Sequence, residues 1–238
     1  YARLALEHGK HVFCEKPFAL KPSEIRDCFA LAREKGLFLM EMQKCVFLPV
    51  VQELKKRIWA GEFGRIPMAD FSSSFDAGYN SWMFDASKGG GPLFSNASYS
   101  LQLMQYLFDS FVTEQTGLCT RKDSPVENQF ATVMRMENGL IFTNKTSTAA
   151  ETVHVGYLYG EKGYVELPDY WKARKAILHF PRQAPVILDY PCDFELRYEL
   201  GHALSCIREG LTESPVMTEA MSVRTVKTLD ALHRSWNH

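Results

Sequence analysis

The sequence lacks the features that define several classes of protein. Its six cysteines are scattered without a Cys-x-x-Cys pair and its seven histidines do not cluster, so we expect no metal site and free thiols in a reducing cytoplasm. No apolar run approaches the roughly 20 residues that span a bilayer. A formal net charge of −1 leaves no excess of lysine and arginine to bind nucleic acid. We therefore expect a cytoplasmic protein whose partners include neither a membrane nor a nucleic acid.

The sequence also lacks a glycine-rich phosphate-binding fingerprint. Gly89-Gly-Gly91 has neither the G-x-G-x-x-G spacing nor the lysine of a P-loop, and is better explained as a flexible entry to the next helix. The chain begins with Tyr1–Gly9, a helical pattern ended by glycine, which leads directly into the strand-like segment His11–Glu15. We therefore expect the phosphate-binding part of a nucleotide domain to lie upstream of Tyr1, and this chain alone to bind dinucleotide poorly.

What the sequence does contain is an alternation of helices and strands, followed by a series of strands. The segment His11–Glu15, a helix between Lys21 and Lys35 and an apolar strand at Leu37–Met40 are typical of a doubly wound α/β sheet. Further strands are expected at 68–75, 129–136, 140–147, 154–159, 164–167, 176–180 and 185–190, and further helices at 48–60, 93–108, 198–209 and 218–235. The predicted fold class is α/β. Residues 1–63 are the C-terminal remnant of a Rossmann domain with a parallel sheet, and residues 64–238 form an α+β domain with a large, mainly antiparallel open sheet.

Lys16 follows directly on the first predicted strand, and Pro17 fixes the backbone after it. Open α/β sheets bind ligands at the carboxyl ends of their strands, so a lysine there can donate to a ribose hydroxyl and to a substrate oxygen. Its charge would also stabilise an alkoxide that develops during hydride transfer. Spacing alone leaves open, and even favours, a surface lysine at a strand end.

Two further candidates share one helix face, because Ser95 and Tyr99 lie four residues apart near the start of the predicted helix 93–108. A tyrosine in a cleft beside a lysine can act as an acid or base, since the lysine charge is expected to lower its pKa. A core tyrosine with a satisfied hydroxyl explains the same pattern. Trp82 lies in a predicted loop. There it either forms one wall of a binding site for a sugar or another ring, or packs at the junction between the two domains.

Segments spread over essentially the whole chain resemble the Gfo/Idh/MocA family of NAD(P)-dependent oxidoreductases. The most specific is Glu15-Lys16-Pro17 within residues 5–18, which is similar to the Glu-Lys-Pro signature of the family. The resemblance is greatest to the branch with dimeric dihydrodiol dehydrogenase and xylose dehydrogenases, where Leu-Phe-Leu-Met-Glu and a tyrosine at position 99 are usual. The other matching segments are 36–41, 61–64, 89–93, 160–165, 207–210 and 213–216.

The resemblance implies a Rossmann domain, here without about three βα units of ~30 residues each, and a C-terminal domain whose open sheet forms a homo-oligomer. It implies NAD or NADP as cofactor and, as substrate, a small molecule with a secondary alcohol, namely a sugar, polyol or cyclic diol. Lys16 and Tyr99 would be the catalytic residues. The implied cofactor contacts are Glu15, Lys16 and Pro17. The implied substrate contacts are Lys16, Trp82, Ser95 and Tyr99.

The chain departs from the family pattern at two places. Ser95 stands where the family generally has an aspartate that orients the substrate. Lys44-Cys45-Val46 replaces a Trp-Thr-Arg segment that is usual in the dihydrodiol branch. These departures keep an alternative open, in which the protein binds a sugar or dinucleotide as a sensor or regulator without catalysing hydride transfer.

Overall fold

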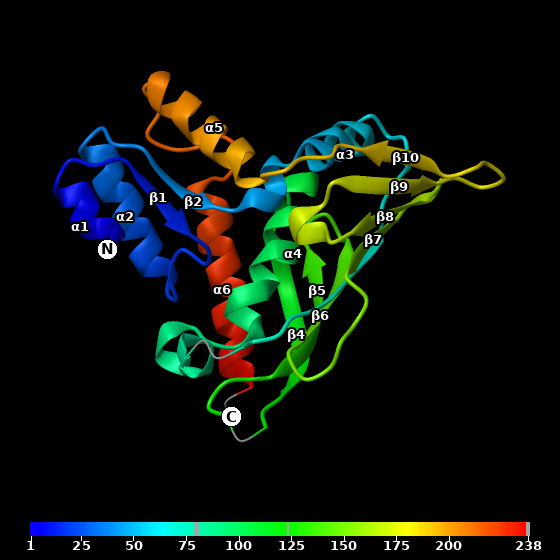
Figure 1. Cartoon of the computed structure of the whole chain (residues 1–238), viewed down its shortest axis with the longest axis horizontal. Helices are drawn as coiled ribbons and strands as arrows, with labels where there is room; N and C mark the ends of the chain where they lie inside the picture. The colour runs from blue at the N-terminus through cyan, green and yellow to red at the C-terminus, as the bar shows by residue number, and fades with distance from the viewer. Residues whose placement is uncertain (79–80, 123, 237–238) are drawn as a thin grey trace.

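The structure, a computed structural model, describes residues 1–78, 81–122 and 124–236. The chain forms a small N-terminal α/β unit beside a larger unit built on one sheet (Figure 1). The helices are α1 (Ala2–Glu7), α2 (Pro22–Glu34), α3 (Pro49–Trp59), α4 (Pro92–Phe108), α5 (Leu196–Arg208) and α6 (Glu219–Ser235), with short 3₁₀ helices η1 (Lys44–Phe47), η2 (Ser81–Phe84), η3 (Ala86–Lys88) and η4 (Tyr170–Lys172). The strands are β1 (Val12–Glu15), β2 (Leu39–Met42), β3 (Met68–Ser74), β4 (Val112–Thr120), β5 (Gln129–Met136), β6 (Ile141–Ser147), β7 (Val155–Tyr159), β8 (Tyr164–Pro168), β9 (Lys175–His179) and β10 (Val186–Asp189).

The N-terminal unit contains the parallel pair that the sequence predicts. β1 and β2 pair in parallel, with Glu15 opposite Met42, so the residues that follow the two strands emerge at the same edge. β2 begins two residues later than the predicted strand, because the N–H of Leu37 still caps α2 by donating to the carbonyl of Ala32 at 2.8 Å. This shift places Gln43, rather than Glu41, directly after the strand.

The larger unit is built on an eight-stranded sheet in the order β10-β9-β8-β7-β3-β6-β5-β4. Only the β3–β6 pair among these described strands is parallel, which confirms a mainly antiparallel sheet. Turns at Glu137–Gly139 and Glu161–Gly163 connect β5 to β6 and β7 to β8. Gly139 takes a φ of +84°, a value that favours glycine over residues with a side chain.

One face of the sheet is covered by helices and the other is open. The ring of Phe130 on β5 packs 6.0 Å from that of Trp236, just after α6. The strand register places alternate residues of neighbouring strands together on the opposite face. Its exposed apolar side chains include Leu118, Val133, Tyr164 and Ile187.

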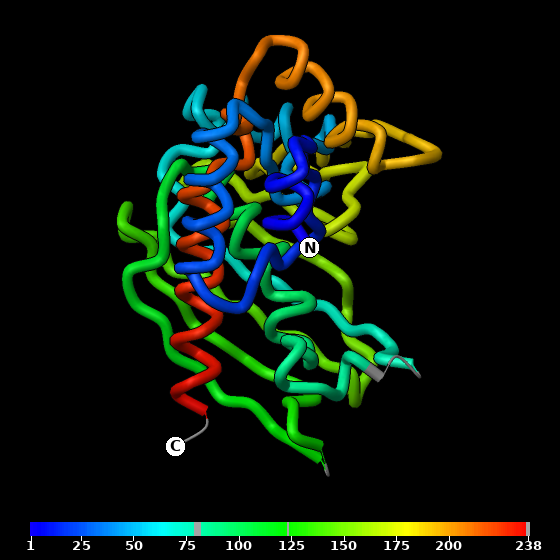
Figure 2. The backbone as a smooth tube through the Cα atoms, turned by 90° about the vertical axis from the view of Figure 1, so that its left-hand side faces the viewer, coloured from blue at the N-terminus to red at the C-terminus, as the bar shows by residue number. Residues whose placement is uncertain are grey.

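The C-terminal helix joins the two units. α6 packs against both α2 and α4, and Val226 of α6 is fully buried in the core of the N-terminal unit. Figure 2, turned by 90° from Figure 1, shows α6 alongside α2. The segment before α6 also returns to this unit, since the N–H of Leu39 donates to the carbonyl of Thr212 at 3.1 Å. The two units therefore share a packed interface rather than a linker.

Candidate active site

Lys16 lies between the two units. It follows β1 and reaches α4, where its ammonium donates a hydrogen bond to the carbonyl oxygen of Ser95 and lies 4.2 Å from the centre of the Tyr99 ring. Burial lowers the pKa of Lys16 to about 8, and Lys44 acts in the same direction while Glu15 opposes the shift. The strand end and the helix therefore hold this ammonium at the junction, and no carboxylate among the described residues forms an ion pair with it.

Tyr99 packs its ring under this cation, on the face that α4 turns toward β1. The arrangement is a cation–π contact, so the lysine faces the ring rather than the hydroxyl. The expectation that Lys16 lowers the pKa of Tyr99 is wrong. Burial raises the pKa of Tyr99 well above its usual value, and the surrounding acidic groups act in the same direction. The hydroxyl is therefore protonated at neutral pH and suited to donate a hydrogen bond.

A cavity of about 370 Å³ collects four of the predicted site residues, which are Lys16, Trp82, Ser95 and Tyr99. The Ser95 hydroxyl does not replace the carboxylate usual in the family, because it turns back along its own helix and donates to the carbonyl of Gly91 at 2.6 Å. Asn96, Asp76 and Trp171 also line this cavity. Asn96 follows Ser95 on α4, whereas Asp76 comes after β3 and Trp171 lies in η4. The sequence pattern marks neither Asn96 nor Asp76 as a site residue.

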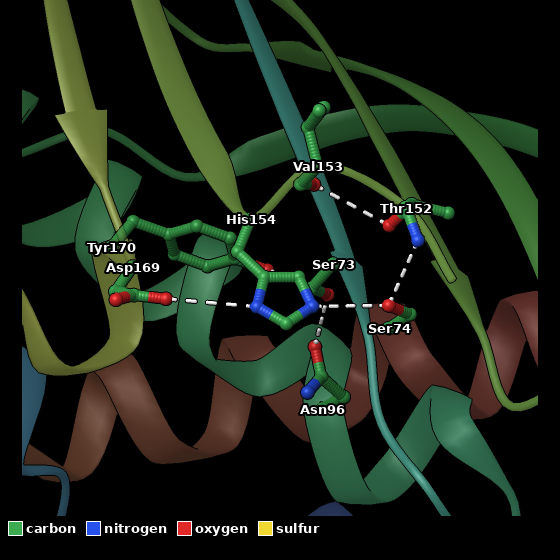
Figure 3. Close-up of polar contacts among 8 residues, drawn as sticks. All are labelled: Ser73, Ser74, Asn96, Thr152, Val153, His154, Asp169 and Tyr170. Atoms are coloured by element: carbon green, nitrogen blue, oxygen red, sulfur yellow. Dashed lines mark hydrogen bonds and ion pairs between the residues drawn. The ribbon is translucent and has the colours of Figure 1, made fainter.

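A polar network behind the cavity fixes Asn96 (Figure 3). The Asn96 side-chain oxygen accepts from the hydroxyl of Ser73 at 3.0 Å. The neighbouring Ser74 hydroxyl lies 3.0 Å from Nε2 of His154, whose Nδ1 lies 3.6 Å from Asp169. Ser74, His154 and Asp169 have the order of a charge-relay triad, but the Ser74 oxygen already accepts the backbone N–H of Thr152 at 2.9 Å. We therefore interpret this cluster as a support for the cavity wall.

A second, smaller cavity of about 120 Å³ lies at the carboxyl edge of β1 and β2, on the other side of Lys16 and Tyr99. It is lined by Glu15, Lys16, Met42, Gln43, Lys44, Tyr99, Leu196 and Glu199. Pro17, whose peptide bond with Lys16 is cis, does not line either of these two cavities. Burial, with a further contribution from Glu15, raises the pKa of Glu199 to about 7. Glu15 and Lys16 are thus brought together at this edge, while Pro17 lies beside them in the turn.

Lys44 lines both cavities, and α5 holds it in place. Its ammonium donates to Glu195 at 3.0 Å, and Glu195 also lies 3.5 Å from Arg174. The sequence identified Lys44 only as a departure from the family pattern. Gln43 could have been found by the rule that found Lys16, since it follows the neighbouring parallel strand.

The residues at the carboxyl edge fit the nicotinamide end of a dinucleotide. Ligands of open α/β sheets bind outside the carboxyl ends of the strands, and here that edge carries a buried lysine beside a small cavity. Buried polar atoms without partners among the described residues also lie on its wall, at Gln43 and Glu199. Together, the Rossmann-type edge, the buried lysine and the adjoining polar cavity accord with a nicotinamide-dependent oxidoreductase.

Comparisons with known proteins agree with this class. Residues 1–43 match the model described as "Oxidoreductase family, NAD-binding Rossmann fold", and residues 51–166 match the "GFO/IDH/MocA C-terminal domain". The trans-1,2-dihydrobenzene-1,2-diol dehydrogenase of Mus musculus is 26% identical over 239 residues, which cover 98% of this chain and 72% of the relative. The chain belongs to the Gfo/Idh/MocA family of NAD(P)-dependent oxidoreductases, as its Glu-Lys-Pro segment predicts.

Solved structures share the fold. An aldose-aldose oxidoreductase from Caulobacter crescentus, complexed with glycerol, superposes with a TM-score of 0.87 at 20% identity over 99% of this chain and 72% of the other. A levoglucosan dehydrogenase in complex with NADH and levoglucosan superposes with a TM-score of 0.85, also at 20% identity, over 98% of this chain and 73% of the other. At such low identity these structures establish the architecture alone.

The helices offer no sign of a membrane span. Among the described residues, no helix combines the length and apolar character that crossing a bilayer requires.

Proposed function

We propose that this protein transfers hydride between the nicotinamide of NAD(P) and the secondary alcohol of a sugar, polyol or cyclic diol. The observation that carries the proposal is the position of Lys16, which lines both the cavity at the carboxyl edge and the larger cavity beside it. NAD(P), when bound, supplies the hydride acceptor or donor. A single ammonium between the two cavities can contact both a ribose hydroxyl and the reacting oxygen of a substrate.

In this proposal Lys16 and Tyr99 share the chemistry. The ammonium of Lys16 polarises the reacting oxygen and stabilises negative charge that develops on it. The Tyr99 hydroxyl, kept protonated by its raised pKa, donates the proton that the oxygen gains when a carbonyl is reduced. In the oxidation direction the alcohol proton passes to Tyr99 in its ionised form, by the reverse of the same step. Ser95 contributes its backbone carbonyl, which orients Lys16, rather than its hydroxyl.

The composition of the larger cavity supports a polyhydroxylated substrate. Indole rings of Trp82 and Trp171 lie on a wall that also carries the polar side chains of Asp76 and Asn96. Aromatic faces with a few polar groups fix the orientation of such a ligand. The relatives are named for a cyclic diol and for sugars, and we extend that substrate class to this chain.

Replacing Lys16 with methionine tests the proposal. Hydride transfer is followed by nicotinamide absorbance across a panel of aldoses, polyols and cyclic diols, and the variant should lose at least a hundredfold in kcat/KM, as expected when electrostatic stabilisation is removed. Lys10→Met, which changes an exposed lysine, is the matched control. If the wild-type protein binds a sugar or NAD(P) without any absorbance change over the whole panel, the sensor alternative replaces this proposal.

We also propose that the open face of the eight-stranded sheet pairs with a second copy of the chain. Leu118 on this face is 81% exposed and Ile187 is 63% exposed. Exposed apolar side chains spread over the open face of a sheet are typical of an interaction surface.

A cytoplasmic location accords with the cysteines. All six thiols are unpaired, Cys45 and Cys206 being buried. Proteins of oxidising compartments commonly use such residues in disulfides, so we infer that this chain works in a reducing compartment.

A further inference from the structure

Two residues that line the cavity at the carboxyl edge each carry a buried acceptor atom that has nothing to accept from. Within the part of the chain that the structure describes, neither Oε1 of Gln43 nor Oε2 of Glu199 has a hydrogen-bond partner. Gln43 is 1% exposed and Glu199 is 2% exposed, and both line this cavity. Buried polar atoms without partners are costly, so a ligand that brings donors to them gains binding free energy.

The orientation of the Gln43 amide is fixed by a chain of hydrogen bonds that starts at a buried carboxylate. Glu41 accepts the N–H of Phe18 at 3.0 Å with one oxygen, and the amide nitrogen of Gln102 at 2.9 Å with the other. Gln102 must therefore turn its carbonyl oxygen toward Gln43, and that oxygen accepts from the Gln43 amide nitrogen. The Gln43 carbonyl oxygen is consequently the atom left free.

The location of these acceptors selects the kind of donor. They lie at the carboxyl edge of β1 and β2, next to Lys16, where the nicotinamide end of the cofactor fits. A primary amide has two N–H donors on one nitrogen, which matches two unpaired acceptors on the wall of one small cavity. Lys44 also lines the cavity and offers an ammonium for the amide oxygen.

We propose that Gln43 and Glu199 accept the two N–H groups of the nicotinamide carboxamide, with Glu41 and Gln102 acting as positioning residues that keep the Gln43 oxygen facing it. The assignment concerns binding and orientation, because the carboxamide does not react. It rests on the proposed NAD(P) function.

Three mononucleotide probes separate the donors from the rest of the ligand. They are nicotinamide mononucleotide, its thionicotinamide analogue, which keeps both N–H donors, and its 3-acetylpyridine analogue, which has a methyl group in place of the NH₂. Dissociation constants are measured by NMR titration of the 238-residue chain. The methyl ketone should bind about tenfold or more weakly than the other two, since it leaves both buried acceptors unpaired.

Variants assign that difference to particular residues. Gln43→Met and Glu199→Met should each reduce the preference for the amide over the methyl ketone, and Gln115→Met, on the edge strand β4, should leave it unchanged. Glu41→Gln removes the carboxylate that sets the direction of the hydrogen bonds that run through Gln102 to Gln43. It should therefore reduce the preference for the amide over the methyl ketone although Gln43 itself is intact. Circular dichroism of each variant checks that the fold is retained.

The outcomes distinguish this inference from the proposed function. Equal affinity for all three probes, or a preference that survives in Gln43→Met and Glu199→Met, means that water or nothing satisfies these acceptors and overturns the carboxamide assignment alone. Failure of every probe to bind at millimolar concentration overturns this inference and removes the support for NAD(P) at this edge as well.

Discussion

At the scale of single residues, the site depends on how α4 presents Tyr99 to Lys16. The ring supports the ammonium and the hydroxyl serves the substrate, so the two parts of the side chain have separate functions. Tyr99→Phe keeps the ring and should lower kcat about a hundredfold, the usual contribution of a positioned acid. Tyr99→Leu also removes the cation–π contact and should lower kcat/KM further.

Steady-state kinetics of the two variants, with thermal melts of both, provide the measurement. Equal losses in Tyr99→Phe and Tyr99→Leu would argue against a role of the ring in positioning Lys16. Undiminished turnover in Tyr99→Phe would contradict the assignment of the hydroxyl.

The lowered pKa of Lys16 predicts a specific pH dependence. The ammonium loses its proton above about pH 8, so kcat/KM should fall as pH rises through that value. Lys16→Arg keeps its charge over the whole range and should show no such limb, even if its activity is lower. A limb near pH 8 that persists in Lys16→Arg would assign the titration to another group.

The lowered pKa of Lys16 also makes the free energy of unfolding increase as pH rises. A lysine with a folded pKa of about 8 and an unfolded pKa of about 10.4 binds fewer protons when folded between these values. Its burial therefore costs stability below pH 8, and this cost is relieved as pH rises toward 10.4. Lys16→Met should remove this dependence in urea denaturation.

The positions of Lys16 at a strand end and of Ser95 and Tyr99 on one helix face were predictable because they follow from local patterns, while the selection of these residues and Trp82 for the site rested on the family resemblance. The electrostatics were not predictable. The pKa of Tyr99 depends on which part of the ring the lysine approaches and on how deeply the hydroxyl is buried. Both depend on the packing of β1 against α4, which are about 80 residues apart.

At the scale of elements, α4 is held at its start by a side chain from the segment before β5. The Glu127 carboxylate accepts the N–H of Leu93 at 2.8 Å, and a Cβ on Gly91 would lie 2.5 Å from the same oxygen. The contact satisfies one of the free N–H groups of the first turn and adds a negative charge there. It therefore fixes the end of the helix that carries Ser95 and Tyr99.

Glu127→Ala should lower the free energy of unfolding by about 1–3 kcal/mol, because it leaves a buried N–H without an acceptor. Urea denaturation measures the change. Glu114→Ala is the control. It removes an exposed carboxylate of β4 that pairs with Arg135 of β5, and it should lower the free energy of unfolding by about 0–1 kcal/mol. Equal effects of the two substitutions would contradict the proposed role of Glu127.

The elements differ in how clearly the sequence marks them. β5 to β9 alternate buried and exposed residues, and glycine turns connect β5 to β6 and β7 to β8, so their prediction was close. β4 (Val112–Thr120) was missed. It is an edge strand with mostly exposed polar residues and with Gly117 at its centre, so neither hydrophobic alternation nor β propensity marks it. It becomes a strand by pairing with β5.

At the scale of the whole molecule, the proposed self-association can be tested on the open sheet face. Leu118→Asp and Val133→Asp place charges on neighbouring exposed strands and should convert a dimer to a monomer in size-exclusion chromatography with light scattering. Leu204→Asp alters an exposed leucine of α5 (46% exposed) and should leave the mass unchanged. A monomeric wild-type protein at micromolar concentration would exclude this interface.

The sequence by itself determined the local elements, the parallel and antiparallel character of the two units, and the family signature around Lys16, because these depend on short-range spacing and turn chemistry. Only the tertiary structure decided that α6 completes the N-terminal core, that Lys44 is held by α5, and that Gln43 and Glu199 adjoin one cavity. These relations join residues that are distant along the chain. Their contacts are fixed by packing and burial, and no local pattern encodes packing or burial between distant elements.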